Sequence, residues 1–338
     1  MLSKTKKLIR VIFLITTTVC ALTAAGIWWS VGAFFPRYSQ LKTEYIVNAV
    51  PKDASPTLRL VTYNIAHGQG FKDHASDWRD EALTRQKMSE VAAVLKKIDA
   101  DVVLLQEVDL NSNRTHHINQ VEWLVDAIGY HYWACAPIWE KNYVPFPYWP
   151  IEHHIGEVKT ANCVLSKYLL SDHRRFIFDK PDSNPFWYNW GYIDRGAQHV
   201  VAHINNKQIT VINVHFEDRD ESAREKQARD LLQWTASMKG PMIIAGDFNA
   251  PPHNAELRYQ DDETIDIIRH GLVDETEAIS ENQHRSDEQS TLTWPSHAPR
   301  SRIDHIFALR GAQVIQGRVI KEAGNASDHL PVWAEINY

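Results

Sequence analysis

The sequence predicts a layered α/β (α+β) domain that is preceded by a single transmembrane helix. Two observations predict this. Short apolar runs of strand length recur along the chain, and segments with helical spacing of apolar residues lie between them. In addition, residues 11–35 contain no charged side chain, and a helix needs roughly 20 apolar residues to cross a bilayer.

The N-terminal segment has the charge distribution of a membrane anchor. Residues 1–10 contain four basic side chains and no acidic one. Because basic flanks remain in the cytoplasm, we expect residues 1–10 to be a cytoplasmic tail, residues 11–35 to span the membrane, and the rest to lie on the other side. The prediction is a single-pass protein of the cell membrane with an extracytoplasmic domain, which would be periplasmic in a Gram-negative bacterium.

A cleaved signal peptide is the alternative interpretation of this segment. Small residues at Ala21–Ala25 are typical of a cleavage site. However, the apolar run continues through Trp28 and Trp29 to Phe35, beyond the usual core of a signal peptide, and tryptophan favours the membrane–water interface. We therefore expect an uncleaved anchor.

Residues 36–56 are expected to form a polar linker, and residues 57–338 a single domain. A domain of this length can bury one sizeable core. The elements expected in chain order are the strands Leu58–Tyr63, Val102–Gln106, Ala161–Leu165, Gln198–Ile204, Ile209–Val214, Met242–Ala245, Ile303–Ala308 and Val332–Ile336, and the helices Glu81–Ile98, Asn119–Ile128 and Ser222–Met238. The sequence does not indicate an oligomeric state.

The charge of the domain bears on its partners. The whole chain has a formal net charge of −6, and residues 1–35 carry four positive and no negative side chains, so the remainder carries −10. Strong nucleic-acid binding requires a basic surface, so the acidic domain disfavours it. Bound metal ions would offset part of this charge locally, which keeps nucleic acid as an alternative partner.

Two cysteines lie outside the predicted anchor, Cys135 and Cys163. An extracytoplasmic location would allow them to pair. The sequence leaves open whether they form a disulfide or remain two buried thiols.

Residues 132–150 combine aromatic side chains with four prolines, a density that excludes a regular helix. A second aromatic group spans residues 186–192. These segments are interpreted either as additional core or as a rim that contacts substrate or membrane. Trp139, Trp149 and Trp187 are the candidate rim residues.

Six strand-like runs lead directly into polar residues, an arrangement that places polar groups at a sheet edge, where active sites are commonly built. One such segment alone would be interpreted as a turn, but six in one chain indicate a site. The segments are Thr62-Tyr63-Asn64-Ile65, Leu105-Gln106-Glu107-Val108, Asn213-Val214-His215, Gly246-Asp247-Phe248-Asn249, Arg302-Ile303-Asp304-His305 and Ser327-Asp328-His329.

In their residues, order and rough spacing these segments resemble the endonuclease/exonuclease/phosphatase superfamily. This superfamily includes pancreatic-type deoxyribonuclease, abasic-site endonucleases, neutral sphingomyelinases and inositol-phosphate phosphatases. The resemblance covers about residues 57–338. It implies a four-layer α/β/β/α sandwich of two packed mixed sheets, and a metal-dependent hydrolase that acts on a phosphoester substrate.

The resemblance implies Mg²⁺ or Mn²⁺ as the cofactor. Glu107 matches the direct ligand, Asn64 would lie beside it at a neighbouring strand end, and Asp328 is a further candidate. Hard divalent ions prefer such oxygen ligands. The sequence has no CxxC or HExxH pattern, which disfavours a thiolate or helical zinc site.

The catalytic roles also follow from the resemblance. Asp247 would orient or deprotonate the attacking water, and Asn249 would hold a phosphate oxygen. An extended segment would point both side chains to one side, since they are two residues apart. His329 would contact the phosphate or act as the base, with Asp304 orienting its imidazole. His215 would stabilise or protonate the leaving side, and which histidine is the acid stays open.

Four further residues are candidates for substrate binding: Arg114, Arg195, Arg302 and His67. Arginine binds phosphate with two parallel hydrogen bonds. The alternatives are surface salt bridges for the arginines and a loop position satisfied by backbone groups for the histidine.

The sequence therefore predicts a membrane-anchored, divalent-metal-dependent phosphodiesterase, with a lipid or small phosphodiester favoured as substrate. A deoxyribonuclease-like nuclease is the alternative enzyme. A catalytically inactive binding module of the same fold is the non-enzymatic alternative, and the presence of every expected polar position argues against it.

Overall fold

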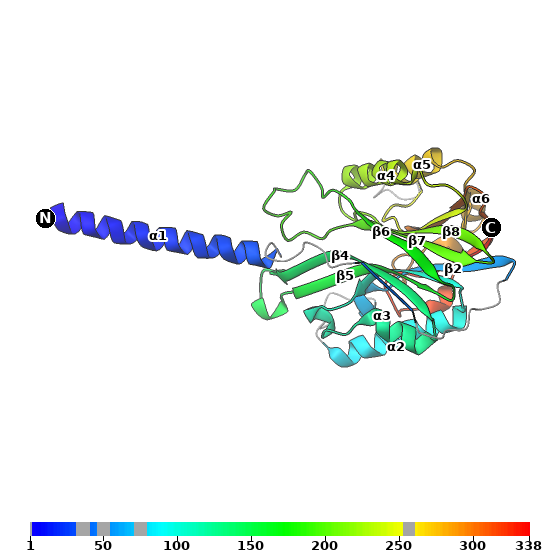
Figure 1. The fold of residues 1–338 in the computed structure, drawn as a ribbon, viewed down its shortest axis with the longest axis horizontal. Helices are drawn as coiled ribbons and strands as arrows, with labels where there is room; N and C mark the ends of the chain where they lie inside the picture. Colours follow the sequence, from blue (N-terminus) through cyan, green and yellow to red (C-terminus); the bar gives the residue numbers. More distant parts are fainter. Residues whose placement is uncertain (1, 32–40, 46–54, 71–79, 253–260) are drawn as a thin grey trace.

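Two β-sheets pack face to face, and helices cover the outer face of each sheet (Figure 1). The structure is a computed structural model that describes residues 2–31, 41–45, 55–70, 80–252 and 261–338. The layers follow the order helices, sheet, sheet, helices. The four-layer α/β/β/α sandwich expected from the resemblance is therefore confirmed.

The first sheet has seven strands, of which β2 and β3 form its only parallel pair within the described residues. In spatial order the strands are β1 (Lys42–Tyr45), β4 (Tyr132–Val144), β5 (Gly156–Ser166), β3 (Val102–Asp109), β2 (Thr57–Asn64), β13 (Val332–Asn337) and β12 (Gln313–Val319).

The second sheet has six strands and repeats this plan, with β8 and β9 as the parallel pair. Its spatial order is β10 (Thr276–Glu277), β11 (Asp304–Leu309), β9 (Met242–Asp247), β8 (Lys207–His215), β7 (Gly196–Ile204) and β6 (Leu170–Ile177). Since strands of a parallel pair end at the same edge of a sheet, each sheet gathers two strand ends at one place.

Helices α2 (Glu81–Ile98) and α3 (Gln120–Ile128) cover the first sheet, and α4 (Glu221–Thr235) and α5 (Thr264–Gly271) cover the second (Figure 1). Two short helices, α6 (Glu281–Ser286) and α7 (Glu288–Thr291), precede β11. Asp80 caps α2 by accepting hydrogen bonds from the backbone N–H groups of Ala82 and Leu83, and Asp220 caps α4 in the same way through Ala223.

Three apolar clusters hold the layers together. Leu60 and Leu104 of the first sheet and Val211 and Ile243 of the second belong to the cluster between the sheets. The other two clusters lie between each sheet and its helices. The strands at the centre of each sheet are buried on both faces, which explains why they are continuous apolar runs instead of alternating ones.

The sheet edges differ from the sequence expectation. The stretch expected to be linker contains β1, which pairs antiparallel with β4 through residues 42–45. Residues 36–40 and 46–54 of this stretch lie outside the described part. β4, β6, β10 and β12 were not predicted, because they are edge or mixed-polarity strands. The proline-rich half of residues 132–150 does lack a helix, as predicted.

α1 (Leu2–Ser30) extends away from the sandwich (Figure 1). Within it, Lys4–Ser30 is long and apolar enough to cross a membrane, a property that a signal sequence shares. The predicted end of the span, residues 32–35, lies outside the described part.

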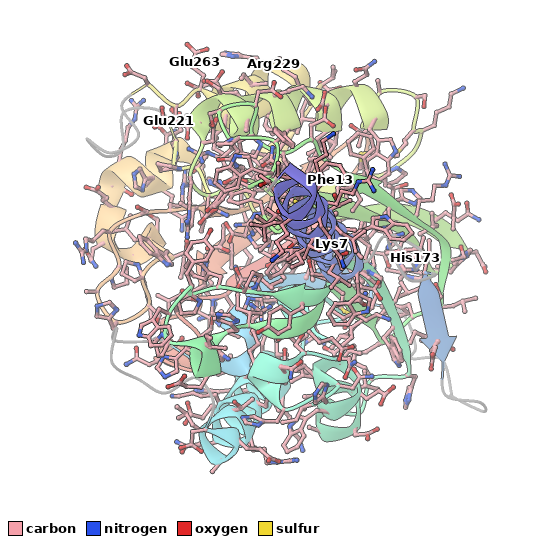
Figure 2. The ribbon with its side chains drawn as sticks, turned by 90° about the vertical axis from the view of Figure 1, so that its left-hand side faces the viewer. Lys7, Phe13, His173, Glu221, Arg229 and Glu263 are labelled. Carbon is pink, nitrogen blue, oxygen red and sulfur yellow. A yellow bond between two sulfur atoms is a disulfide. The ribbon has the colours of Figure 1, made fainter. Side chains whose placement is uncertain are left out.

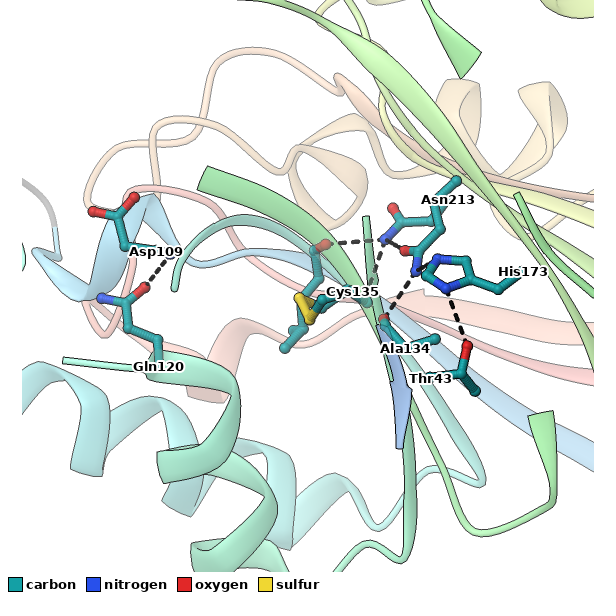
Figure 3. The surroundings of a disulfide bond; sticks show 10 residues. Thr43, Asp109, Gln120, Ala134, Cys135, His173 and Asn213 are labelled. Carbon is teal, nitrogen blue, oxygen red and sulfur yellow. Dashed lines mark hydrogen bonds between the residues drawn. A yellow bond between two sulfur atoms is a disulfide. The ribbon is translucent and has the colours of Figure 1, made fainter. Parts of the chain in front are cut away.

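A buried polar network connects the two sheets around a disulfide between Cys135 and Cys163 (Figure 3). Asn213 of β8 donates to the carbonyls of Leu105 and Cys163 in the other sheet, at 3.0 and 3.1 Å. Gln198 donates to the carbonyl of Ala134 at 2.8 Å. Because each of these buried groups would be costly to leave unpaired, the network fixes how the sheets are placed on each other.

Candidate active site

The polar residues predicted from the six segments converge at one edge of the sandwich. In the second sheet, His215, Asp247 and Asp304 are consecutive partners across β8, β9 and β11. Asn64 and Glu107 lie at the corresponding end of the first sheet. The Nδ2 atom of Asn64 donates to Oδ2 of Asp247 at 2.9 Å, so the two sheets meet at this hydrogen bond.

Asp247 is the central residue of this cluster. Its Oδ1 accepts from the backbone N–H of Asn249 at 2.9 Å, and its Oδ2 lies 3.5 Å from Nε2 of His215 and 3.7 Å from Nε2 of His329. Burial and the nearby Asp304 carboxylate raise the pKa of Asp247 to about 7, although the positive charge of His329 acts to lower it. This carboxyl group is thus placed to exchange a proton near neutral pH.

His329 and Asp304 form a buried pair. Nδ1 of His329 lies 2.9 Å from Oδ2 of Asp304, which leaves Nε2 facing Asp247. Burial alone would lower the pKa of His329, but the carboxylates of Asp304 and Asp247 outweigh it and raise this pKa well above its ordinary value. The two carboxylates therefore favour the positively charged form of this imidazole.

His215 has the opposite electrostatic environment. Arg195, directly before β7, places its Nη1 2.5 Å from Nε2 of His215, and its Nη2 3.0 Å from Oδ1 of Asp218. Burial and the Arg195 charge lower the pKa of His215 well below its ordinary value. His215 is therefore neutral at neutral pH, so the two histidines are not equivalent.

Glu107 reaches the site through a β-bulge. Leu105 and Val108 of β3 pair with Cys163 and Ala161, so β3 contains one residue more than β5 across this stretch. The φ angle of Glu107 is +57°, a conformation that costs a non-glycine residue of order 1–3 kcal/mol. Bulges commonly redirect a side chain next to an active site.

The Glu107 carboxylate is ionised and pairs with His67. Nε2 of His67 lies 2.9 Å from Oε2 of Glu107. Burial would raise the pKa of Glu107, but His67, His215 and Arg195 hold it well below its ordinary value. The side chain retains 22% of its exposure, so it is open to a ligand from solvent.

Asn249 and Asp328 complete the edge. Asn249 has a φ of +51°, and its Nδ2 donates to the carbonyl of Phe216 at 3.0 Å. The expected extended segment from Asp247 to Asn249 is wrong, because β9 ends at Asp247 and the chain turns there. Burial raises the pKa of Asp328, whose charge also interacts with Glu107.

These residues fit a hard divalent cation. Ligand atoms of Asp247, Asp304 and His329 all lie within 4.8 Å of one another. The two carboxylates can bind a cation, whereas the raised pKa of His329 favours its imidazolium form, which has no free lone pair for a metal ion. Oδ1 of Asp304 is buried and has no hydrogen-bond partner within the described residues. Glu107 and Asn64 add oxygen atoms from the neighbouring sheet, and such a set suits Mg²⁺ or Mn²⁺.

Two of the arginines predicted to bind substrate are engaged elsewhere. Arg114 makes two hydrogen bonds of 2.9 Å to Asp109 and lies 3.0 Å from Nδ1 of His67, behind Glu107. Arg302 is fully buried and donates to the carbonyl of Ile279 at 2.7 Å. The structure brings Arg195 and His67 into the cluster, whereas Arg114 supports it from behind and Arg302 lies apart from it.

The sequence interpretation missed several acidic residues around the cluster. Asp109 lies two residues after Glu107 and anchors Arg114 and His67. Glu217 and Asp218 directly follow the His215 segment, and Asp218 binds Arg195. Asp109 and Glu217 lie two residues after Glu107 and His215, a spacing that could have indicated them, whereas Asp218 lies three residues after His215 and has no such signal.

Comparison with known proteins agrees with this architecture. Residues 61–329 match the model of the Endonuclease/Exonuclease/phosphatase family. Among solved structures, an endonuclease/exonuclease/phosphatase from Beutenbergia cavernae is 20% identical, with a TM-score of 0.58 over 83% of this chain and 71% of that one. No protein of curated function matches the sequence.

Two further similar structures have titles that state an activity or a ligand. A mannosyl-6-phosphatase from Bacteroides thetaiotaomicron is 16% identical, with a TM-score of 0.56 over 83% of this chain and all of that one. TDP2 of D. rerio, complexed with a single-strand DNA product, is also 16% identical, with a TM-score of 0.55 over 83% of this chain and 99% of that one.

Solved structures at such identities show that the fold is shared. The family match is stronger, because it covers most of the sandwich, from β2 to His329. The chain therefore belongs to the Endonuclease/Exonuclease/phosphatase family.

Proposed function

We propose that this protein is a membrane-anchored, divalent-metal-dependent phosphodiesterase whose catalytic domain lies outside the cytoplasm. The observation that carries the proposal is the convergence of His215, Asp247, Asp304 and His329 with Glu107 at one edge of both sheets. Members of this family hydrolyse phosphoester bonds, and the cluster has the groups that this reaction needs.

Glu107 and Asn64 would hold the metal ion, with Asp328 as a further candidate ligand. When bound, a Mg²⁺ or Mn²⁺ ion would neutralise charge on the phosphate and polarise the ester. The ionised state of Glu107 and its partial exposure to solvent support such a site.

The remaining residues would act on the water and the phosphate. Asp247, whose raised pKa allows it to accept a proton near neutral pH, would orient the attacking water. The charged His329, held by Asp304, would bind a phosphate oxygen together with Asn249. Neutral His215 and Arg195 would lie on the leaving side, where Arg195 can stabilise developing negative charge.

The location outside the cytoplasm has two supports. The basic residues that precede the apolar part of α1 favour a cytoplasmic N-terminus. The disulfide between Cys135 and Cys163 is typical of proteins in an oxidising compartment.

A lipid or small phosphodiester is the proposed substrate. The net charge of −10 after residue 35 works against the phosphate contacts that nucleic-acid binding requires. The domain would therefore act on duplex DNA poorly.

The test is a substrate panel with the purified full chain in detergent. A soluble phosphodiester, a phosphomonoester, a short-chain phospholipid and duplex DNA are each incubated with Mg²⁺ or Mn²⁺. The proposal predicts hydrolysis of the phosphodiester or phospholipid at a higher kcat/KM than that of DNA. Efficient DNA cleavage without lipid or small-diester hydrolysis would establish the nuclease alternative, and no hydrolysis of any substrate would establish the binding-module alternative.

A further inference from the structure

We propose that two aromatic loops of this protein form a bilayer-docking surface that holds the active-site edge against the membrane. The aromatic loops are residues 145–155, between β4 and β5, and residues 183–193, between β6 and β7. The consequence is that the substrate is the phosphoester head group of a membrane lipid. The identification of a lipid substrate rests on the proposed function. The docking surface rests on the exposure of the two loops and on their position next to the end of α1.

Both loops expose large aromatic side chains. Tyr148 and Trp149 in the first loop are 66% and 77% exposed, and Phe186 and Trp187 in the second are 72% and 56% exposed. Residues 183–193 include no charged side chain, and residues 145–155 include one acidic side chain, Glu152. Exposed apolar surface of this kind is unfavourable in water and marks a site of contact with another apolar phase. Trp139, in contrast, is buried, so its predicted place in the rim is wrong.

The loops lie at the same end of the sandwich as the catalytic cluster. The second loop leads into β7 at Gly196, which pairs directly with His215. In the first sheet, Asp109 pairs with Thr160, and β5 continues past this point to Gly156 at the base of the first loop. At roughly 3.3 Å per residue, the first loop begins about 13 Å beyond the Glu107 end of β3.

The membrane-spanning helix ends at this same place. Nδ2 of Asn142, on β4 just before the first loop, donates to the carbonyl of Trp29 near the end of α1, at 2.8 Å. Figure 1 shows α1 leaving the sandwich at the end of β4 and β5, and Figure 2 looks onto this face with α1 projecting from it. If α1 spans a bilayer, Trp28 and Trp29 lie at its outer interface, and the first loop lies within a few residues of that plane.

The loops are built rigidly enough to present these side chains. Lys180 donates to the carbonyls of Asn189 and Tyr192, which braces the second loop from within. Asp194, directly after the second loop, binds both Lys180, at 3.1 Å, and Lys141 of β4, at 3.3 Å, so one buried carboxylate links the base of the second loop to the strand that precedes the first. These polar contacts fix the base of the second loop, from which Phe186 and Trp187 project.

The chemistry of the surface selects a bilayer as its partner. Trp and Tyr rings favour the interface between head groups and acyl chains, where their polar atoms remain hydrated. The domain is acidic, so attraction to anionic lipids would not hold it there, and docking is expected to depend on apolar insertion instead. Continuity with the end of α1 favours the membrane over a second protein.

The first experiment measures lipid contact in the full chain, reconstituted in phosphatidylcholine nanodiscs. In a Cys20→Ala background, single cysteines are introduced by Trp149→Cys, Trp187→Cys or, as a control, Ile315→Cys, and are labelled with a polarity-sensitive fluorophore without reduction. Ile315 is 55% exposed, but β12 places it toward the opposite end of the sheet, near Asn337 and Thr57. We expect a blue shift and quenching by nitroxide lipids at positions 149 and 187, and neither at 315. If the probes at positions 149 and 187 show the same emission and the same lack of quenching as the probe at 315, the proposed docking surface is wrong.

The second experiment separates docking from catalysis. The double variant Trp149→Ala/Trp187→Ala is compared with the control Val273→Ala/Ile315→Ala, which removes exposed apolar side chains elsewhere. Loss of about 1.4 kcal/mol of interfacial binding should reduce hydrolysis of bilayer phospholipid about tenfold, with a soluble phosphodiester unaffected. Equal loss on both substrates would contradict the proposal. Lipid contact by the probes without hydrolysis of any phosphoester would refute the proposed function and the lipid substrate, but not the docking surface.

Discussion

Two histidines in one small cluster have pKa values that are shifted in opposite directions, and each shift has an identifiable cause. His329 is surrounded by the carboxylates of Asp304 and Asp247, which favour the imidazolium form. His215 faces the guanidinium of Arg195, which favours the neutral form. A pair of titratable groups with pKa values pushed apart is typical of acid–base chemistry. The motifs alone cannot assign these shifts, because the neighbours that cause them come from distant parts of the chain.

Replacing either histidine with alanine should remove acid–base or phosphate-binding capacity without unfolding the protein. We expect His215→Ala and His329→Ala each to lower kcat/KM by about 100- to 10,000-fold. Both variants should still melt cooperatively, with a lower melting temperature for His329→Ala, which leaves the buried Asp304 carboxylate without its partner. Activity that persists within a few-fold of wild type in either variant would remove that histidine from the mechanism.

A second residue-scale prediction concerns stability and pH at Glu277. Burial would raise its pKa, but the hydrogen bond from His305 and the charges of Arg302 and Arg269 lower it to about 2. Since a folded-state pKa below the unfolded value stabilises the ionised group, this contribution is present above about pH 4.3 and is lost as the pH falls toward 2. It amounts to about 3 kcal/mol by the usual conversion.

The measurement is chemical denaturation of the wild type and Glu277→Gln as a function of pH. The variant should be less stable at pH 7 by an amount of that order, and the difference should shrink as the pH is lowered from about 4.5 to about 2. A difference that does not change across this range would show that the Glu277 charge does not stabilise the fold.

Among the elements, the strands that carry the site depend on one glycine. Gly246 in β9 has a φ of +151°, and a Cβ atom there would lie 2.0 Å from the carbonyl oxygen of Val214 in β8. Both strands end at catalytic positions, so their close approach also sets the spacing of His215 and Asp247. This contact explains why glycine precedes the aspartate in the Gly246-Asp247-Phe248-Asn249 segment.

Gly246→Ala should therefore destabilise the protein by more than about 2 kcal/mol, because backbone atoms cannot move aside as a flexible side chain would. Gly240→Ala is a suitable control for positive φ alone, since its φ is +83° and nothing lies within 4 Å of its Cβ position. Equal melting temperatures for the two variants would contradict the proposed strand contact.

The accuracy of the sequence interpretation differed between elements for a physical reason. Central strands and helix α2 were predicted well, because a buried strand is apolar throughout and α2 has both a regular apolar face and an Asp80 cap. β1 was assigned to a linker, because its pairing with β4 is supplied by a segment some ninety residues away. The bulge at Glu107 was also missed, since only the register with β5 reveals it.

The same limit applies within the site. Asn64, Glu107, His215, Asp247, Asp304 and His329 were predicted because each follows a recognisable strand or motif. The environment of Arg114 and Arg302 was not predictable, because their partners Asp109 and Ile279 are selected by tertiary packing. The burial of Trp139 was also not predictable, because no local sequence pattern distinguishes it from the exposed Trp149.

For the whole molecule, the orientation of the chain across the membrane is testable directly. The basic residues before Val11 should keep the N-terminus in the cytoplasm and place the sandwich, with its disulfide, on the other side. A reporter fused after Tyr338 that works only in an extracytoplasmic compartment should be active. Activity of a cytoplasmic reporter at that site would refute the orientation, and a mature N-terminus near Gly26 would show a cleaved signal peptide.

The central claim is that this edge of the sandwich is a metal-dependent hydrolytic site in which Glu107 is a ligand. The most direct measurement is the rate of hydrolysis of the best substrate by the full chain as a function of Mg²⁺ or Mn²⁺ concentration, for the wild type and Glu107→Gln. We predict no activity in excess chelator, recovery on adding metal, and a half-maximal metal concentration at least about tenfold higher in the variant, equivalent to about 1.4 kcal/mol of metal binding. Full activity of the wild type in excess chelator, or an unchanged metal requirement in a folded Glu107→Gln variant, would contradict the account.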